Sequence, residues 1–321
     1  MKRLLLILSM KPNILVGGQA VIEGVMMRVP GAYSTAVRCP NGDIKIKRKE
    51  FSSITEHSIL WSKPIFRGIA SLYEAMKMGM STLQWSADIS YPEESSEGIL
   101  SKIMDIMTTI FSITLAISLF MVLPMWLTTK LLSIEKEALW FNISSGVFRI
   151  IFFVVYLFLI SKMKDIARLF QYHGAEHKVV YNFESGNDLS VAEAQSFPTQ
   201  HPRCGTSFMF IVLLSAIFVF AIVDTIIIYY FGTISLSTRL LFHLPLIPLV
   251  SGIGYELIKI TSKNDRLIFR ILKAPGILLQ NITTKQPDDK MIEVSIAALK
   301  DAFGDEYDNF VGKKYTAEAI G

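Results

Sequence analysis

Long apolar runs separated by short polar connections fill the middle of this chain. They cover residues 104–132, 144–162, 207–231 and 237–260. Each run approaches or exceeds the ~20 residues that an α-helix needs to cross a bilayer. Only short connections separate the first run from the second and the third from the fourth, so we expect two helical hairpins. The pattern predicts an α-helical multi-pass membrane protein with about four transmembrane helices, the first of them interrupted by Pro124.

A different pattern precedes these runs. Residues 13–60 contain short strand-like segments, and Ile44–Lys47 alternates apolar and basic side chains as a half-exposed strand does. Asn41-Gly42, just before this alternation, is a strong hairpin-turn signal. We therefore predict a small N-terminal region that is β-rich, with an α+β character.

Apolar side chains also recur at helical spacing outside the long runs. Within residues 64–90 they are Ile65, Ile69, Leu72, Met76, Met80 and Leu83. Such a stripe usually packs in a core, and the alternative is that it lies on a membrane surface. A second amphipathic helix is predicted at residues 289–302, where Ile292, Ile296 and Leu299 repeat with the same period.

The distribution of charge orients the predicted bundle. Basic residues are frequent in the 162–206 connection and in the tail after residue 260, and they are sparser in the two short connections. The positive-inside rule therefore places both termini and the 162–206 connection in the cytoplasm. The net charge is only +4, and the basic residues flank apolar runs instead of forming one stripe, which argues against nucleic-acid binding. The two cysteines, Cys39 and Cys204, provide no disulfide framework and suit a reducing compartment.

These patterns divide the chain into five regions. They are an N-terminal cytoplasmic β-hairpin and helix region (1–98), a first transmembrane hairpin (99–162), a cytoplasmic histidine-bearing loop (163–206), a second transmembrane hairpin (207–260) and a cytoplasmic tail with a helix (261–321). The short apolar run at residues 4–8 lacks a small-residue cleavage site, so we do not expect a signal peptide.

The most informative motif lies in the histidine-bearing loop. His173-x-x-Glu176-His177 has the H-x-x-E-H spacing of the inverted zinc-hydrolase motif. On a helix these three positions share one face, because residues i, i+3 and i+4 are neighbours. Two imidazoles can then bind Zn²⁺ or another divalent metal while Glu176 handles a proton. The alternative is that the histidines are hydrogen-bonding residues at the membrane interface.

Further metal ligands are expected near this motif. In order of preference they are His201, Cys204, Glu256 and Glu184. His201 and Cys204 are three positions apart in a tight Pro/Gly turn, and Glu256 lies near the cytoplasmic end of the fourth apolar run. The alternative for Glu256 is an ion pair with a lysine such as Lys259. Three protein ligands would leave a coordination position for water, whereas four would make a closed structural site.

A second unusual stretch is residues 17–28. Here Gln19, Glu23 and Arg28 stand among glycines and apolar residues. They either line a ligand pocket or anchor a turn. The glycine spacing matches neither a dinucleotide-binding fingerprint nor a P-loop. Glu74 is a weaker candidate of the same kind.

Taken together, these motifs resemble a known family. Gly17–Arg28, Tyr172–Lys178, His201–Phe208, Gly254–Glu256 and Gln286–Asp289 are similar to the YqhQ-like family. This is a bacterial multi-pass membrane family of unknown function, whose members are described as predicted metal-dependent enzymes. The similarity covers about residues 13–302 and implies a location in the bacterial cell membrane. It adds no independent evidence for a metal, because the description is itself an interpretation of the histidines.

Two functions are compatible with these features. The first is a zinc hydrolase-like enzyme at the cytoplasmic face, acting on a peptide or a lipid-linked group, with Glu176 accepting a proton and Arg203 stabilising negative charge. The second is a non-catalytic module for ligand sensing, transport assistance or assembly, with a structural metal or none. Asp224 and His243, inside predicted membrane helices, favour the second function. Four spans are few for a transporter unless the protein forms a homo-oligomer.

Overall fold

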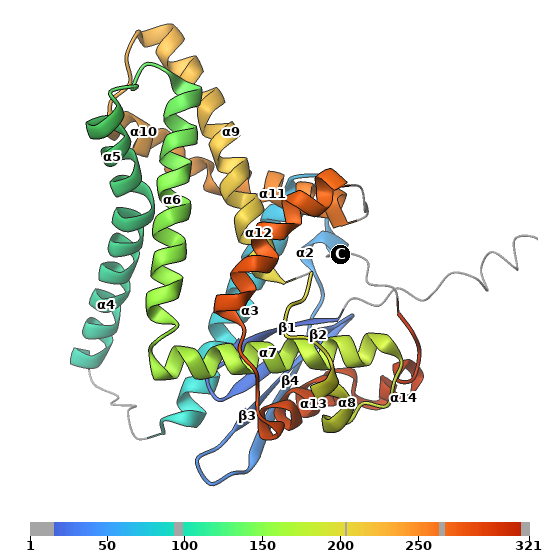
Figure 1. The fold of residues 1–321 in the computed structure, drawn as a ribbon. Helices are drawn as coiled ribbons and strands as arrows, with labels where there is room; N and C mark the ends of the chain where they lie inside the picture. The colour runs from blue at the N-terminus through green and yellow to red at the C-terminus, as the bar shows by residue number, and fades with distance from the viewer. Residues whose placement is uncertain (1–15, 93–98, 203, 263–266, 316–321) are drawn as a thin grey trace, which may run out of the picture.

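An antiparallel sheet forms the base of the molecule. The computed structural model describes residues 16–92, 99–202, 204–262 and 267–315 (Figure 1). The strands are β1 (Gly17–Val21), β2 (Gly24–Val29), β3 (Ala32–Arg38) and β4 (Ile44–Glu50), paired in sequence order. The sheet confirms the predicted β-rich region, and Gly42 in the predicted turn has a φ of +94°, which favours glycine.

One face of the sheet carries the main hydrophobic core. Helices α7 (Lys164–Ser185), α8 (Val191–Ser196) and α13 (Asp289–Phe303) supply the apolar side chains on this face. Val25, Met27 and Val29 of β2 point toward them, while Met26 points to the opposite face, as strand alternation requires. Asp288 caps α13 by accepting from the Met291 N–H at 2.9 Å. The helix predicted at residues 289–302 is therefore confirmed.

This core joins parts of the chain that are far apart in sequence. The sheet, the histidine-bearing loop and the C-terminal tail, which the sequence assigns to three separate regions, all contribute side chains to it. Figure 1 shows α7 and α13 lying across the sheet below the long helices. The leader at residues 1–12 lies outside the described residues.

Helix α3 (Phe66–Ser90) covers the other face of the sheet, after the short helix α2 (Ile54–His57). Its predicted apolar stripe does not form the packed face: Met76, Met80 and Leu83 are 58%, 69% and 40% exposed. The buried face instead carries small and polar residues, because α3 approaches the sheet closely. A Cβ on Gly79 would lie 2.7 Å from the side-chain oxygen of Gln19. The exposed stripe fits the membrane-surface alternative.

The long helices stand on one side of this layer (Figure 1). They are α4 (Ile99–Ile117), α5 (Leu123–Leu132), α6 (Ala138–Ile160), α9 (Gly205–Phe231), α10 (Leu236–His243) and α11 (Ile247–Ser262). Short connectors are the π-helix η1 (Ser118–Val122) and the 3₁₀ turn η2 (Leu244–Leu246). Four stretches of the described chain are long and apolar enough to cross a membrane: Ile106–Leu132, Ala138–Ile160, Phe208–Phe231 and Leu236–Thr261.

Pro124 does not break the first of these stretches. The helix passes through η1 immediately before the proline and continues as α5. Proline lacks an N–H and its ring crowds the preceding turn, so a wider π turn accommodates it without ending the helix.

The longest helix for which the sequence analysis made no prediction is α12 (Leu267–Thr283). It runs beside α9 and ends at the start of the tail, which continues through η3 (Gly304–Glu306) and α14 (Tyr307–Phe310) after α13. Pro275 lies inside α12. A proline inside a helix removes one backbone donor, so this helix has a weaker local signal than the others.

Candidate metal centre

Two histidines and one cysteine converge where α7 meets the start of α9. His173 and His177 lie one turn apart on α7, and Cys204 is the N-cap residue of α9. Their candidate ligand atoms all lie within 4.8 Å of one another. His177 and Cys204 are buried and His173 is half-buried. The structure therefore brings together the two motif histidines and one of the additional ligands predicted from the sequence.

Backbone carbonyl groups orient both imidazole rings. His173 Nδ1 is 2.8 Å from the carbonyl oxygen of Thr283, and His177 Nδ1 is 2.5 Å from that of Thr199. A carbonyl oxygen only accepts hydrogen bonds, so each Nδ1 carries the proton and each Nε2 keeps its lone pair. This is the arrangement in which a metal-binding histidine is held by a second hydrogen bond.

The donor set fits a zinc ion. Imidazole nitrogen and thiolate sulfur are preferred zinc ligands, and Zn–N and Zn–S bonds of about 2.0–2.3 Å place ligand atoms roughly 3.5 Å apart in a tetrahedron. His173 Nε2 and Cys204 Sγ are 3.2 Å apart. Cys204 also stands at the helix end where the backbone dipole favours negative charge. These three side chains can hold a divalent metal after small adjustments, and they leave a fourth position free.

Close packing and buried hydrogen bonds position this group. Gly174 lies against the segment after α12, because an added Cβ would be 2.1 Å from the carbonyl oxygen of Lys285. Lys178, the residue after the motif, donates to the carbonyl oxygens of Gln195 and Phe197 at 2.8 and 2.5 Å. It thereby fixes the loop that carries Thr199. These contacts hold both carbonyl acceptors in place.

Glu176 lies beside the group. Its side chain is buried, and Oε2 is 3.4 Å from His177 Nε2. Strand β1 forms a wall here, since a Cβ on Gly18 would lie 2.8 Å from Glu176 Cγ. Glu176 therefore stands within reach of the nitrogen that would face a metal, in the place that a proton acceptor requires.

His201 lies next to the group and is not part of it. Its ring centre is 5.6 Å from that of His177 and 4.3 Å from that of Tyr181. Gln280 holds its backbone through hydrogen bonds of 2.6 and 2.9 Å. Burial lowers the pKa of His201 to about 4, against an opposing effect of Glu176, so its ring is neutral at neutral pH. The sequence ranking placed His201 before Cys204, whereas the converging group contains Cys204 and not His201.

The remaining ligand candidates lie elsewhere. Glu184 is near His201, with its Oε2 3.8 Å from His201 Nε2. Glu256 accepts two hydrogen bonds from Arg67, at 2.7 and 2.5 Å, so its main partner is an arginine. This paired carboxylate is not among the converging ligands. Arg203, predicted to stabilise negative charge, lies outside the described residues.

Two of the three N-terminal polar residues bind opposite helices. Glu23 forms an ion pair with Arg168 on α7 and accepts from the Tyr172 hydroxyl at 3.3 Å. Burial and the neighbouring Glu23 raise the pKa of Tyr172. Gln19 instead donates to the Gly79 carbonyl on α3 at 3.5 Å. These residues connect the sheet to the helices on its two faces.

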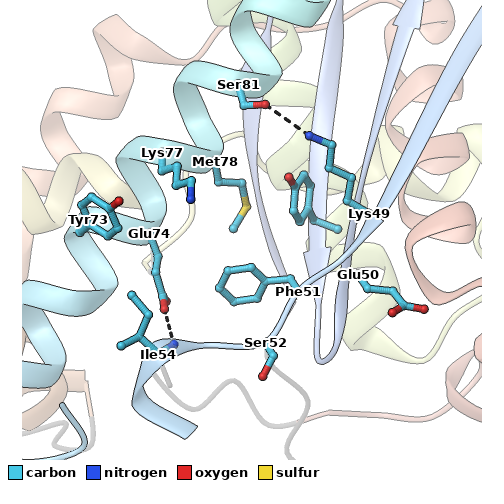
Figure 2. Close-up of a pocket in the computed structure, with 11 residues that line it drawn as sticks. Lys49, Glu50, Phe51, Ser52, Ile54, Tyr73, Glu74, Lys77, Met78 and Ser81 are labelled. Carbon is cyan, nitrogen blue, oxygen red and sulfur yellow. Dashed lines mark hydrogen bonds between the residues drawn. The ribbon is translucent and has the colours of Figure 1, made fainter. Parts of the chain in front are cut away.

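A cavity of about 340 Å³ lies on the α3 side of the sheet. The guanidinium of Arg28, the third N-terminal polar residue, lies 4.3 Å from the ring centre of Phe51, which lines this cavity. Burial lowers the pKa of Arg28. Figure 2 shows Glu74 pointing to the Ile54 N–H, which it binds at 2.6 Å, and Lys49 reaching Ser81. No histidine or cysteine is among the residues that line this cavity, so it lacks the ligand types of the candidate metal group.

A separate polar cluster lies among the long helices. Asp224 is fully buried and accepts from Asn142 at 2.7 Å and from His243 Nε2 at 2.9 Å. Arg239 Nε is 3.2 Å from the same carboxylate. The sequence analysis kept Asp224 and His243 apart from the metal site, and the structure pairs them with each other.

Fold and site together define a class of protein. It combines four helices of membrane-crossing length with a small antiparallel sheet and a largely buried His-His-Cys group that is a candidate metal site. The chain belongs to the family described as "Protein of unknown function (DUF1385)", whose model matches residues 63–305. It is 30% identical over 303 residues to the "Uncharacterized protein YqhQ" of Bacillus subtilis (strain 168), covering 89% of this chain and 91% of the relative. No solved structure matches. The resemblance predicted from the motifs is confirmed.

Proposed function

We propose that this chain is a membrane-bound, metal-dependent enzyme of the zinc-hydrolase type. The observation that carries the proposal is the convergence of His173, His177 and Cys204 with Glu176 beside them. Three protein ligands are typical of catalytic zinc sites, which keep one position open, whereas structural sites have four.

Each residue has a role in this proposal. His173, His177 and Cys204 hold the metal, which supplies Lewis-acid activation of water and of a substrate oxygen at neutral pH. Glu176 accepts the proton that water loses as it attacks a carbonyl or phosphoryl centre. The backbone carbonyls of Thr199 and Thr283 keep both rings in the required tautomer. Peptides and lipid-linked groups are the substrate classes that suit a site close to the long helices.

The competing function is a non-catalytic module in which the metal only stabilises the fold. Closing the site would need a fourth ligand, and His201 is the nearest further histidine. Its ring packs against Tyr181, and its backbone is fixed by Gln280. Recruiting it would require this buried loop to move. The present geometry therefore favours the open site.

Cobalt(II) substitution tests the open site. We expect the purified cobalt protein to show a thiolate-to-metal charge-transfer band that Cys204→Ser abolishes and Cys39→Ser retains. Acetohydroxamate should shift the visible ligand-field bands, because an open position can accept it. Visible bands that acetohydroxamate leaves unchanged would contradict an open coordination position and support a closed structural site.

The same preparation tests Glu176. With p-nitrophenyl acetate as a generic probe, Glu176→Gln should keep the cobalt spectrum and lose about 10²–10⁴-fold in turnover, the usual cost of removing a general base. A Glu176→Gln protein that hydrolyses the ester like the wild type would eliminate its role as a base.

We further propose that the four long helices cross the bacterial cell membrane, with both termini and the metal group in the cytoplasm. The first described residue, Val16, and the last, Tyr315, both belong to the core at the sheet end of the molecule. Lys162 and Lys164 lie at the same end, where the positive-inside rule expects them. Only 6% of the most apolar window in the first long stretch is buried, which leaves its surface available to lipid.

Cysteine labelling tests this topology. Cys39 follows β3 and is half-buried, whereas Cys204 is buried, so Cys39 should react first. A membrane-impermeant maleimide should label the protein in permeabilised cells or inverted vesicles, and hardly at all in intact cells. Cys39→Ser should remove most of the signal. Strong labelling of Cys39 from outside intact cells would overturn the orientation.

A further inference from the structure

A second site lies within the long helices. A half-open cavity of about 300 Å³ is bounded by η1, α6, α9, α11 and α3. Phe120, Phe153 and Phe208 form much of its lining, together with Leu213. The only charged residue that lines it is Arg149, at the middle of α6. An apolar cavity with one fixed cation has the composition of a ligand site, in which few polar groups set orientation.

Among the residues that the structure describes, Arg149 forms no ion pair, and Asp224 acts on its charge only over a longer distance. The residue is 7% exposed, and its Nε has no hydrogen-bond acceptor. Its recorded contact is with the ring of Phe220, whose centre lies 5.6 Å from the guanidinium carbon. Arginine stays protonated in proteins, so this position holds a buried positive charge.

The nearby carboxylate is already engaged. Asp224 Oδ2 accepts from Asn142 and lies 3.2 Å from Arg239 Nε, while Oδ1 accepts from His243. The two oxygens of Asp224 thus contact one arginine, one histidine and one amide, and Asp224 acts on Arg149 only through longer-range attraction. A buried charge without an ion-pair partner is costly, and an anion entering the cavity would compensate it.

We propose that this cavity binds the carboxylate end of a long-chain fatty acid. A guanidinium binds a carboxylate through two parallel N–H donors, which suits a site with a single cation. The phenylalanines and Leu213 supply the apolar surface for the adjoining methylene groups. A cavity of this size is at the small end for ligand pockets, so it accommodates part of one chain while the remainder leaves through the open side.

The site is independent of the proposed metal chemistry. The cavity and the candidate metal group are neighbours, because Phe208 and Cys204 lie about 6 Å apart along the axis of α9 at 1.5 Å per residue. They nevertheless use different side chains. None of the candidate metal ligands lines the cavity. Binding of the acid should therefore survive removal of the metal by a chelator.

Photo-crosslinking tests the proposal. The probes are palmitic acid with a diazirine on its chain and the corresponding fatty alcohol, each added to the purified full-length protein in detergent. The acid should label peptides of α6 and α9 at least several-fold more than the alcohol. Arg149→Met keeps side-chain length and removes the charge, so acid labelling should fall to the alcohol level. Ile151→Met, on the same helix and 48% exposed, is the matched control and should label like the wild type.

A second variant keeps the test decisive if Arg149→Met does not fold. Met209 lines the cavity and is 40% exposed, so Met209→Trp can fill it with little strain. It should reduce acid labelling with Arg149 in place. Equal labelling by acid and alcohol, or undiminished acid labelling in both variants, would overturn the site. Acid labelling in a protein that binds no metal would contradict the proposed function and leave this site intact.

Discussion

Replacing His177 with alanine is expected to remove most of the metal from the purified protein, from about one ion per chain to less than about a tenth. Removing a residue that merely orients a ligand costs 10–100-fold in metal affinity, and removing one of three ligands costs more. His173→Ala and Cys204→Ser should have the same effect, because all three ligand atoms face one another. Inductively coupled plasma mass spectrometry of the purified proteins measures the loss.

Matched controls are available in the same chain. His57 is exposed on α2, and Cys39 directly follows β3. Neither residue is one of the candidate metal ligands. His57→Ala and Cys39→Ser should keep a full metal content. His201→Ala separates the two site types: retention of metal supports three ligands, and loss supports a closed site with four. A wild-type protein purified without any metal would refute the metal proposal as a whole.

Asp224→Ala is expected to cause the largest loss of stability, about 3–5 kcal/mol in the free energy of unfolding. The substitution leaves Arg239 and His243 without the carboxylate they share. Removing one partner of a buried ion pair leaves an uncompensated charge, which costs more than the pair itself contributes. The melting temperature in detergent micelles, followed by intrinsic fluorescence, reports the change.

The neighbouring Thr225→Ala is the control for this experiment. Thr225 is exposed, and its hydroxyl donates only to the Ala221 carbonyl of its own helix, so its loss should cost less than about 1 kcal/mol. The double variant Asp224→Ala with Arg239→Met should recover part of the stability, because it removes both charges. An Asp224→Ala protein that melts with the wild type would contradict the cluster's role in stability.

Elements with a strong local pattern could be predicted from the sequence. The four apolar runs correspond closely to the long helices, since length and hydropathy suffice to find such segments. The Asn41-Gly42 turn fixes the β3–β4 hairpin, and the period of Ile292, Ile296 and Leu299 identifies α13. In each case the deciding interaction is within one short segment.

Elements decided by tertiary contacts could not be predicted. Helix α3 exposes its apolar stripe because Gly79 allows close packing against Gln19, and periodicity carries no information about that approach. The sequence also does not reveal that the sheet, α7 and α13 share one core. A hydrophobic pattern indicates which face of an element is buried, but not which other element packs against that face.

The candidate metal group was predictable in part. The spacing of His173, Glu176 and His177 indicates one helix face, and the structure has that helix. The orientation of His201 depends on tertiary contacts with Gln280 and Tyr181, which the sequence pattern does not reveal. The carbonyl groups that orient the rings have no side-chain signal, so sequence analysis missed them.

One hydrophobic core is built from distant stretches of the chain. This core can therefore form completely only after its last stretch has been synthesised. Strands β1 to β4 leave the ribosome first, yet the helix that covers much of their apolar face, α13, follows every long helix in the chain. The Thr283 carbonyl that orients His173 is synthesised only shortly before α13. The candidate metal group therefore gains one of its two orienting carbonyls only after all three ligands have been synthesised, and a chain that stops before α12 lacks the Thr283 acceptor of His173.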